Sequence, residues 1–163
     1  MMKIEISNDN IVVFLNKYIT RNINYKDSKV MESELKDIFD KLEKYYNIKI
    51  KGYYDVCIYI DNNYGAILEL TKDDMDYLEY DDTLIDMRIV IKNTNILYKI
   101  DDFMKFNIPY KVYFYKDNFY LELLGNIDDI TEGKILENSE IIYKDIDIIK
   151  KYGHILKKEE IMI

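Results

Sequence analysis

The sequence predicts an α+β fold, with antiparallel hairpins, one long amphipathic helix packed on the sheet and a strand-rich second half. Two observations lead to this class. Alternating apolar runs flank turns rich in Asn and Asp in both halves, and one long segment repeats its apolar residues at helical spacing. With 163 residues, 48% of them hydrophobic and 33% charged, the chain can bury the core of one compact domain or of two packed halves.

The N-terminal segment predicts a hairpin. Residues 3–6 and 11–15 are strand-like, and the run Ser-Asn-Asp-Asn at 7–10 between them is a turn signal. A second hairpin is predicted from residues 55–60 and 66–70, joined by a turn in which Gly65 permits a positive φ. Alternation along residues 55–60 places three aliphatic side chains on one face of the strand and Cys57 on the other.

A long helix is predicted between these hairpins, from about residue 29 to residue 46. Asp27 or Ser28 can cap its first free amides, and lysines near its other end suit the negative pole of the helix dipole. Its apolar side chains recur at steps of three and four: Met31, Leu35, Ile38, Leu42 and Tyr45, with Phe39 and Tyr46 widening the stripe. We expect this stripe to cover a sheet in a two-layer unit.

An acidic segment follows, and it divides the predicted organisation into residues 1–72, a connector at 73–82 and a strand-rich half at 83–163. The carboxylates of this connector are candidates for contact with a basic partner surface, as are two tyrosines of a later strand that we expect to be exposed. These candidate residues are Asp73, Asp74, Asp76, Glu79, Asp81, Asp82, Tyr113 and Tyr115.

The second half predicts mainly strands. They lie at residues 84–91, 96–99, 110–115 and 119–123, with a short helix around 101–106. The run "NIDDITEG" interrupts the pattern, and the C-terminal segment offers a strand followed by either a short helix or another strand ending at Gly153. The hairpin of residues 110–123 echoes that of 55–70, but it follows no long helix, which indicates similar hairpins in unequal halves.

Composition and single residues argue against several kinds of site. The formal charge of -8 disfavours direct binding to nucleic acid, because phosphate contacts need clustered Lys and Arg. A lone histidine, His154, excludes zinc sites that need two, and Cys57 forms no internal disulfide and reads as a small buried hydrophobe. The five glycines form no phosphate-binding loop. We therefore expect no catalytic residues, metal or cofactor.

The N-terminal residues contain no apolar signal region followed by a small-residue cleavage site. The longest apolar runs are far below the roughly 18 residues of a membrane-spanning helix. We therefore expect a cytoplasmic protein without membrane contact, and a single cysteine agrees with a reducing compartment.

Four stretches resemble the MecA and YpbH family of adaptor proteins: "MKIEISNDNIVVFL", "YNIKIKGYYDVCIYIDNNYGAILELTK", "YKVYFYKDNFYLEL" and "IIKKYGHIL". Their order along the chain matches the family, although the acidic linker is shorter here and the long helix after the second hairpin is missing. The resemblance implies a non-enzymatic adaptor whose first half recruits a substrate protein and whose second half contacts a Clp-type ATPase. No binding residue of the family is matched to a position here.

The function that these observations favour is a small cytoplasmic protein-binding module, adaptor-like, that presents hairpin faces and acidic turns to a partner protein. An alternative is an acidic inhibitor from a phage or other mobile element, which would block a nucleic-acid-binding protein by imitating phosphate spacing. An enzyme with paired carboxylates is a third possibility, because Asp and Glu are numerous.

Overall fold

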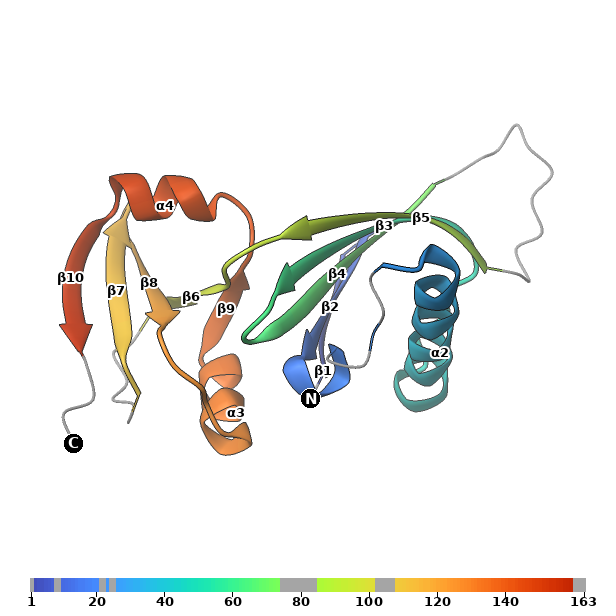
Figure 1. Cartoon of the computed structure of the whole chain (residues 1–163), viewed down its shortest axis with the longest axis horizontal. Coiled ribbons are helices and arrows are strands. Elements are labelled where there is room, and N and C mark those ends of the chain that lie inside the picture. The colour runs from blue at the N-terminus through green and yellow to red at the C-terminus, as the bar shows by residue number, and fades with distance from the viewer. Residues whose placement is uncertain are drawn as a thin grey trace. The chain divides into compact units, whose positions relative to one another are not determined.

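The structure, a computed structural model, forms two compact units, Met1–Lys92 and Asn93–Ile163, each built around its own five-stranded sheet (Figure 1). The residues that the structure describes are 2–7, 10–20, 23, 26–73, 85–101 and 108–159. The class is α+β, as predicted, with strands outnumbering helices. None of the described helices is long and apolar enough to cross a membrane.

The first sheet has the strand order β1-β2-β4-β3-β5. Its strands are β1 (Met2–Ser7), β2 (Asn10–Asn16), β3 (Gly52–Asp61), β4 (Gly65–Lys72) and β5 (Ile85–Asn93). Both predicted hairpins of this half are confirmed, since β1 pairs antiparallel with β2 and β3 pairs antiparallel with β4. Strand β2 also pairs with β4, which joins the two hairpins into one sheet. A single turn of helix, α1 (Lys17–Thr20), follows β2.

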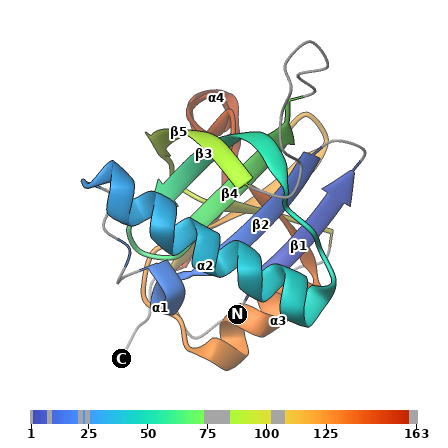
Figure 2. The same cartoon turned by 90° about the vertical axis from the view of Figure 1, so that its right-hand side faces the viewer.

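Helix α2 (Ser28–Tyr46) has the predicted extent, and its start is set by Asp27. The Asp27 carboxylate accepts hydrogen bonds from the backbone amides of Lys29 (3.0 Å) and Val30 (3.3 Å), two groups that have no partner within the helix. Five of its side chains are buried and belong to one core cluster with side chains of β2, β3, β4 and β5: Met31, Leu35, Ile38, Phe39 and Leu42. In Figure 2 the ribbon of α2 passes in front of β2 and β4.

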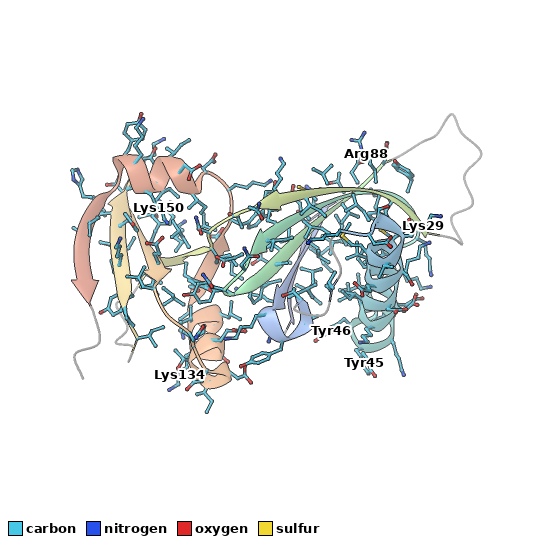
Figure 3. All side chains as sticks on the ribbon, in the orientation of Figure 1. Lys29, Tyr45, Tyr46, Arg88, Lys134 and Lys150 are labelled. Atoms are coloured by element: carbon cyan, nitrogen blue, oxygen red, sulfur yellow. The ribbon has the colours of Figure 1, made fainter. Side chains whose placement is uncertain are left out.

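The last two residues of the predicted stripe, Tyr45 and Tyr46, are exposed instead (Figure 3). The helix ends here because Asn47 adopts a left-handed conformation with φ 56°. The amide of Ile48 then bonds back to the carbonyl of Leu42 at 3.2 Å, which redirects the chain. Tyr45 is 67% exposed as a result, so the buried stripe stops one turn earlier than the sequence pattern indicates.

Gly65 allows the close approach of β4 and β2 at the end of their ladder. It has a φ of 133°, a conformation that residues with a Cβ rarely adopt, and it lies opposite Asn16 in the ladder. A Cβ at this position would collide with the carbonyl oxygen of Leu15. The close approach of the two strands therefore requires glycine here.

Strand β5 joins the first sheet as the neighbour of β3, although the sequence pattern assigned this segment to the second half. Arg88 of β5 pairs with Asp55 of β3 at 3.2 Å. The two units consequently divide after Lys92, later in the chain than the acidic connector. The cause is that β3 has a free edge once β4 is paired on its other side, and sequence spacing does not reveal which edge a strand joins. Residues 74–82 of the connector lie outside the described part of the chain.

The second sheet has the strand order β10-β7-β8-β6-β9. Its strands are β6 (Leu97–Ile100), β7 (Tyr110–Tyr115), β8 (Asn118–Leu123), β9 (Ser139–Ile142) and β10 (His154–Glu159). The hairpin of β7 and β8 is confirmed, with a turn of two residues, 116–117, and a second strand that begins at Asn118, one residue earlier than predicted. The short helix expected around 101–106 falls almost entirely outside the described residues.

Two helices complete the second unit: α3 (Asp129–Glu137) and α4 (Ile146–Tyr152). Helix α3 forms where the run "NIDDITEG" was expected only to interrupt the strand pattern. Its start is set by the Asp128 carboxylate, which accepts a hydrogen bond from the amide of Thr131 at 2.7 Å. Hydrogen bonds from the side chain and the backbone amide of Thr131 hold the pKa of Asp128 below its ordinary value, and the charge of Lys134 acts in the same direction. Of the two options expected for the segment that ends at Gly153, the structure has the short helix, α4, and the strand β10 that follows it was not predicted.

Candidate functional site: an open groove on the second sheet

The second unit carries an open groove with a volume of about 460 Å³. Its lining comes from the turn between β7 and β8, from β8 and β9, from the turn after β9 and from one side of α4. The lining residues are Tyr115, Lys116, Tyr120, Glu140, Ile141, Ile142, Tyr143, Lys144, Asp145, Ile148 and Ile149. Aromatic and branched aliphatic side chains thus meet two lysines and two carboxylates in one concave surface.

The groove exists beside α4 because this helix has only seven residues. Its Ile146 and Ile149 form a small core cluster with Leu97, Tyr113 and Tyr120 of the sheet. Seven residues of α-helix span roughly 10 Å, whereas five strands spaced about 4.8 Å apart are nearly twice as wide. The helix is therefore too short to cover the full width of this sheet, and the groove lies beside it.

A polar network fixes α4 to the sheet. Lys150 of α4 forms an ion pair with Glu122 of β8, and the hydroxyl group of Tyr113 on β7 donates a hydrogen bond to the same carboxylate at 3.2 Å. Glu122 is buried, and a buried polar group without hydrogen-bonding partners is costly, so both contacts stabilise this arrangement. Burial raises the pKa of Tyr113 to about 12, and the charge of Glu122 and the hydrogen bond to it act in the same direction.

Two turns with the same sequence, Tyr-Lys-Asp, frame the groove. The first joins β7 to β8 at residues 115–117, and the second joins β9 to α4 at residues 143–145. In both turns the aspartate has a positive φ, 63° for Asp117 and 60° for Asp145. In both, the lysine ammonium also lies over the ring of the tyrosine before it, at 5.3 Å in the first turn and 5.6 Å in the second.

The first of these turns has a clear local cause. Lys116 has a φ of 47° beside the positive φ of Asp117, and two consecutive positive values are typical of the type I′ turns that close two-residue hairpins. Asp and Asn tolerate this conformation, and the side-chain amide of Asn118 donates a hydrogen bond to the carbonyl of Lys116 at 3.1 Å. The turn thereby holds Tyr115 and Lys116 at the groove.

The candidate residues of the sequence analysis separate in the structure. Tyr115 lines the groove and is partly buried. Tyr113 is only 4% exposed, so the expectation that it is exposed is wrong: α4 covers it and Glu122 binds its hydroxyl group. Asp73 is exposed just after β4. The other five, Asp74, Asp76, Glu79, Asp81 and Asp82, lie outside the described residues.

Sequence reasoning missed the remaining groove residues. The Tyr-Lys-Asp at 115–117 and 143–145 was the available signal in the second unit, because each copy ends in a residue that tolerates positive φ, although the same tripeptide also stands at 25–27 in the first unit. Ile148 carried no such signal: only the path of α4 shows that this side chain borders the groove.

The described residues include no group of three or more His, Cys, Asp or Glu side chains arranged to hold a metal ion. Cys57 is partly buried on β3, on the face opposite Val56 and Ile58, and His154 is exposed at the start of β10. Neither residue lines the groove.

Comparison of the chain with protein-family models, with curated proteins and with solved structures finds no match.

Proposed function

We propose that this protein is a non-enzymatic protein-binding module and that the groove of the second unit holds a segment of its partner. The observation that carries the proposal is the groove itself: an open, concave surface in which tyrosine and isoleucine side chains are ringed by charged ones. Tyrosine supplies a large contact area at low cost in side-chain entropy, and an apolar centre with a polar rim is the usual anatomy of a protein interface.

The first unit has a different role in this proposal. We treat it as a two-layer arrangement with α2 packed on its sheet, because side chains of α2 share one core cluster with side chains of four strands. The acidic run that begins at the exposed Asp73 is the proposed contact for a basic surface of a protein partner. Two separate contact regions suit a cytoplasmic adaptor, and the resemblance to the MecA and YpbH family suggests a Clp-type ATPase as one of the two partners.

Substitution of one exposed residue of the groove tests the proposal. Ile148 of α4 is 44% exposed and borders the groove, so Ile148→Asp places a charge in the proposed contact surface without removing core packing. Ile130 of α3 provides the matched control, because it is 72% exposed, lies on a helix of the same unit and does not line the groove.

The measurement is quantitative capture of proteins from a lysate of the source cells by the immobilised full chain. Wild type and Ile130→Asp are expected to retain the same protein at near-stoichiometric level, and Ile148→Asp is expected to lose it by roughly tenfold or more. Failure of the wild type to retain any protein at that level would contradict the proposal. Equal retention by Ile148→Asp would remove the groove from it.

A further inference from the structure

We infer that two copies of this chain associate through β5, which pairs antiparallel with β5 of the second copy about a two-fold axis at Ile89. The inference concerns the first sheet and does not depend on the groove or on the proposed function. It is carried by the position and length of β5 as an outer strand, and by the self-complementarity of its sequence in one register.

Strand β5 is the longest outer strand of the two sheets in the part of the chain that the structure describes. It has nine residues, whereas β1 and β10 have six each and β9 has four. The pairing of β10 also shifts register between Ile155 and Lys157. Short outer strands and bulges are features by which proteins keep sheet edges from pairing with other chains. Of these strands, β5 therefore offers the longest template for an added strand.

Apolar side chains are exposed on both faces of β5. Met87 is buried and Ile89 packs against the core cluster that includes α2, so the odd-numbered residues of this strand face α2. Ile91 on that face is 38% exposed, and Val90 on the opposite face is 44% exposed. Figure 2 shows β5 beside β3 at the border of the sheet. A strand added at this border would cover apolar surface on both faces.

Symmetry restricts the register in which β5 can pair with itself. A two-fold axis that relates antiparallel outer strands stands perpendicular to the sheet, and directly opposite residues lie on the same face, so the axis passes beside a residue. An axis at Arg88 would set Arg88 opposite itself, and an axis at Val90 would set it opposite Lys92 of the second copy. Like charges directly opposite each other are destabilising. An axis at Ile89, the central residue, avoids both pairs and matches all nine residues.

On the face towards α2 this register brings apolar residues together. It sets Met87 opposite Ile91 of the second copy, and Ile89 opposite its own counterpart. Ile91 is exposed in the single chain, so pairing would remove it from water beside a buried methionine. The apolar clusters of the two copies would then adjoin each other across the axis.

On the other face the register matches charges of opposite sign. It sets position 86, an aspartate, opposite Lys92 of the second copy. It also sets Val90 opposite Arg88, whose guanidinium group is paired with Asp55 of β3 at 3.2 Å and points away from α2 in Figure 3. The carbon chain of Arg88 can cover the exposed valine while its charge stays paired. Opposite charges at directly opposed positions stabilise antiparallel pairing.

Sedimentation velocity of the full chain tests the inference. Wild type is expected to shift from monomer towards dimer between roughly 1 and 100 µM, since two nine-residue strands make a smaller contact than a standard interface. Val90→Lys sets a lysine opposite Arg88 on both sides of the axis and should raise the dissociation constant of the dimer roughly tenfold or more. Ile6→Lys is the control, because Ile6 is a 61% exposed β-branched residue of β1, at the other border of the same sheet. Both substitutions reduce the net negative charge equally, which by itself would favour association.

Charge exchange tests the register. Asp86→Lys sets a lysine opposite Lys92 of the second copy and is expected to weaken association, although it also reduces the net negative charge of the chain. The double variant Asp86→Lys with Lys92→Asp restores opposite charges at these positions and has the net charge of the wild type. It is expected to recover most of the affinity that Asp86→Lys loses.

Three results would overturn the inference: a wild type that stays monomeric over this range, equal loss in Val90→Lys and Ile6→Lys, or a double variant that associates no better than Asp86→Lys. Urea midpoints of all variants distinguish lost association from lost folding. Ile148→Asp in the groove is expected to leave association unchanged. Failure of this inference therefore leaves the proposed function standing, and loss of partner capture leaves this inference standing.

Discussion

The two units differ in how a helix meets the sheet. In the first unit α2 has 19 residues and buries five apolar side chains in a core cluster shared with four strands. In the second unit α4 has seven residues, buries Ile146 and Ile149, and is tied to the sheet by the ion pair of Lys150 with Glu122. The comparison teaches that a short helix held by a polar contact leaves a sheet face partly open, and the open part is the groove.

The same difference determines which interactions hold the helix of each unit in place. Burying a Leu, Ile, Met or Phe side chain contributes roughly 1.5–3 kcal/mol, so α2 makes the larger apolar contribution to its unit. The fixation of α4 depends more on charge and hydrogen bonding. Substitutions in α2 should therefore act mainly through lost apolar packing, and substitutions in α4 mainly through lost charge and hydrogen-bonding contacts.

The largest effect is expected from Leu35→Ala in α2. Leu35 is fully buried in the core cluster of the first unit, and its truncation should lower the free energy of unfolding of that unit by about 2–5 kcal/mol. Urea unfolding combined with hydrogen exchange in α2 measures the loss. Val30→Ala, on the exposed side of the same helix, should change it by less than about 0.5 kcal/mol. Comparable effects of the two substitutions would show that α2 is not held by its apolar stripe.

A smaller loss is expected from Lys150→Met in α4. The substitution keeps most of the carbon chain but leaves the buried Glu122 carboxylate with the Tyr113 hydroxyl group as its remaining partner in this network. Because Lys150 is partly exposed, we expect a loss of about 1–3 kcal/mol rather than the full cost of an unpaired buried charge. Urea unfolding of the second unit measures it.

Lys151→Met is the control for this prediction, since Lys151 is the exposed neighbour and lies over the ring of Tyr152 at 5.3 Å. It should be close to neutral. A Lys150→Met protein as stable as this control would show that apolar packing alone holds α4, and the contrast between the two helices would disappear.

The starts of the helices provide the third prediction. Asp27→Ala removes two hydrogen bonds to free amides of α2 and should cost about 1 kcal/mol in urea unfolding. Asp145, at the start of α4, makes no such bond and has a φ of 60°, which suits glycine. Asp145→Gly should therefore not reduce stability. A loss equal to that of Asp27→Ala would show that Asp145 caps α4 in solution.

The last effect appears only at alkaline pH. The pKa of Tyr113 is raised to about 12 in the folded protein from an ordinary value near 10. The folded state therefore holds this proton more tightly, so the contribution is fully present below about pH 10 and is lost as the pH rises towards 12. Urea midpoints of wild type and Tyr113→Phe, measured between pH 8 and pH 12, should converge only in that interval. A constant difference throughout would contradict the raised pKa.

The sequence allowed the hairpins and α2 to be predicted because each has a local cause: alternation with a turn, or helical spacing with the cap at Asp27. It did not reveal which sheet edge β5 joins, because edge choice depends on strands far apart in the chain. Tyr113 shows the same limit at the site. Alternation puts it on one face with Tyr115, but only the path of α4 decides that Tyr113 is buried while Tyr115 borders the groove.

Helix α3 was missed for a different reason. Its Gly133 and its acidic start read as an interruption, whereas the cap at Asp128 and the burial of Ile135 and Leu136 stabilise a helix there. Predicting the groove would require both local sequence signals and the arrangement of distant strands. Its turns are readable as Tyr-Lys-Asp, but their convergence follows from the order of strands in the second sheet.

Gly65 has a consequence for how the first sheet is assembled. Sliding β4 by one residue along β2 would bring Tyr64 or Ala66 to the place opposite Asn16, where a residue with the backbone conformation of Gly65 would carry a Cβ into the space that the Leu15 carbonyl oxygen occupies. Such a slip would also turn every side chain of β4 to the other face of the sheet. The glycine thus penalises misaligned pairings while the chain is still folding. It therefore favours the correct register of β4 on β2, independently of any stability that it adds to the folded structure.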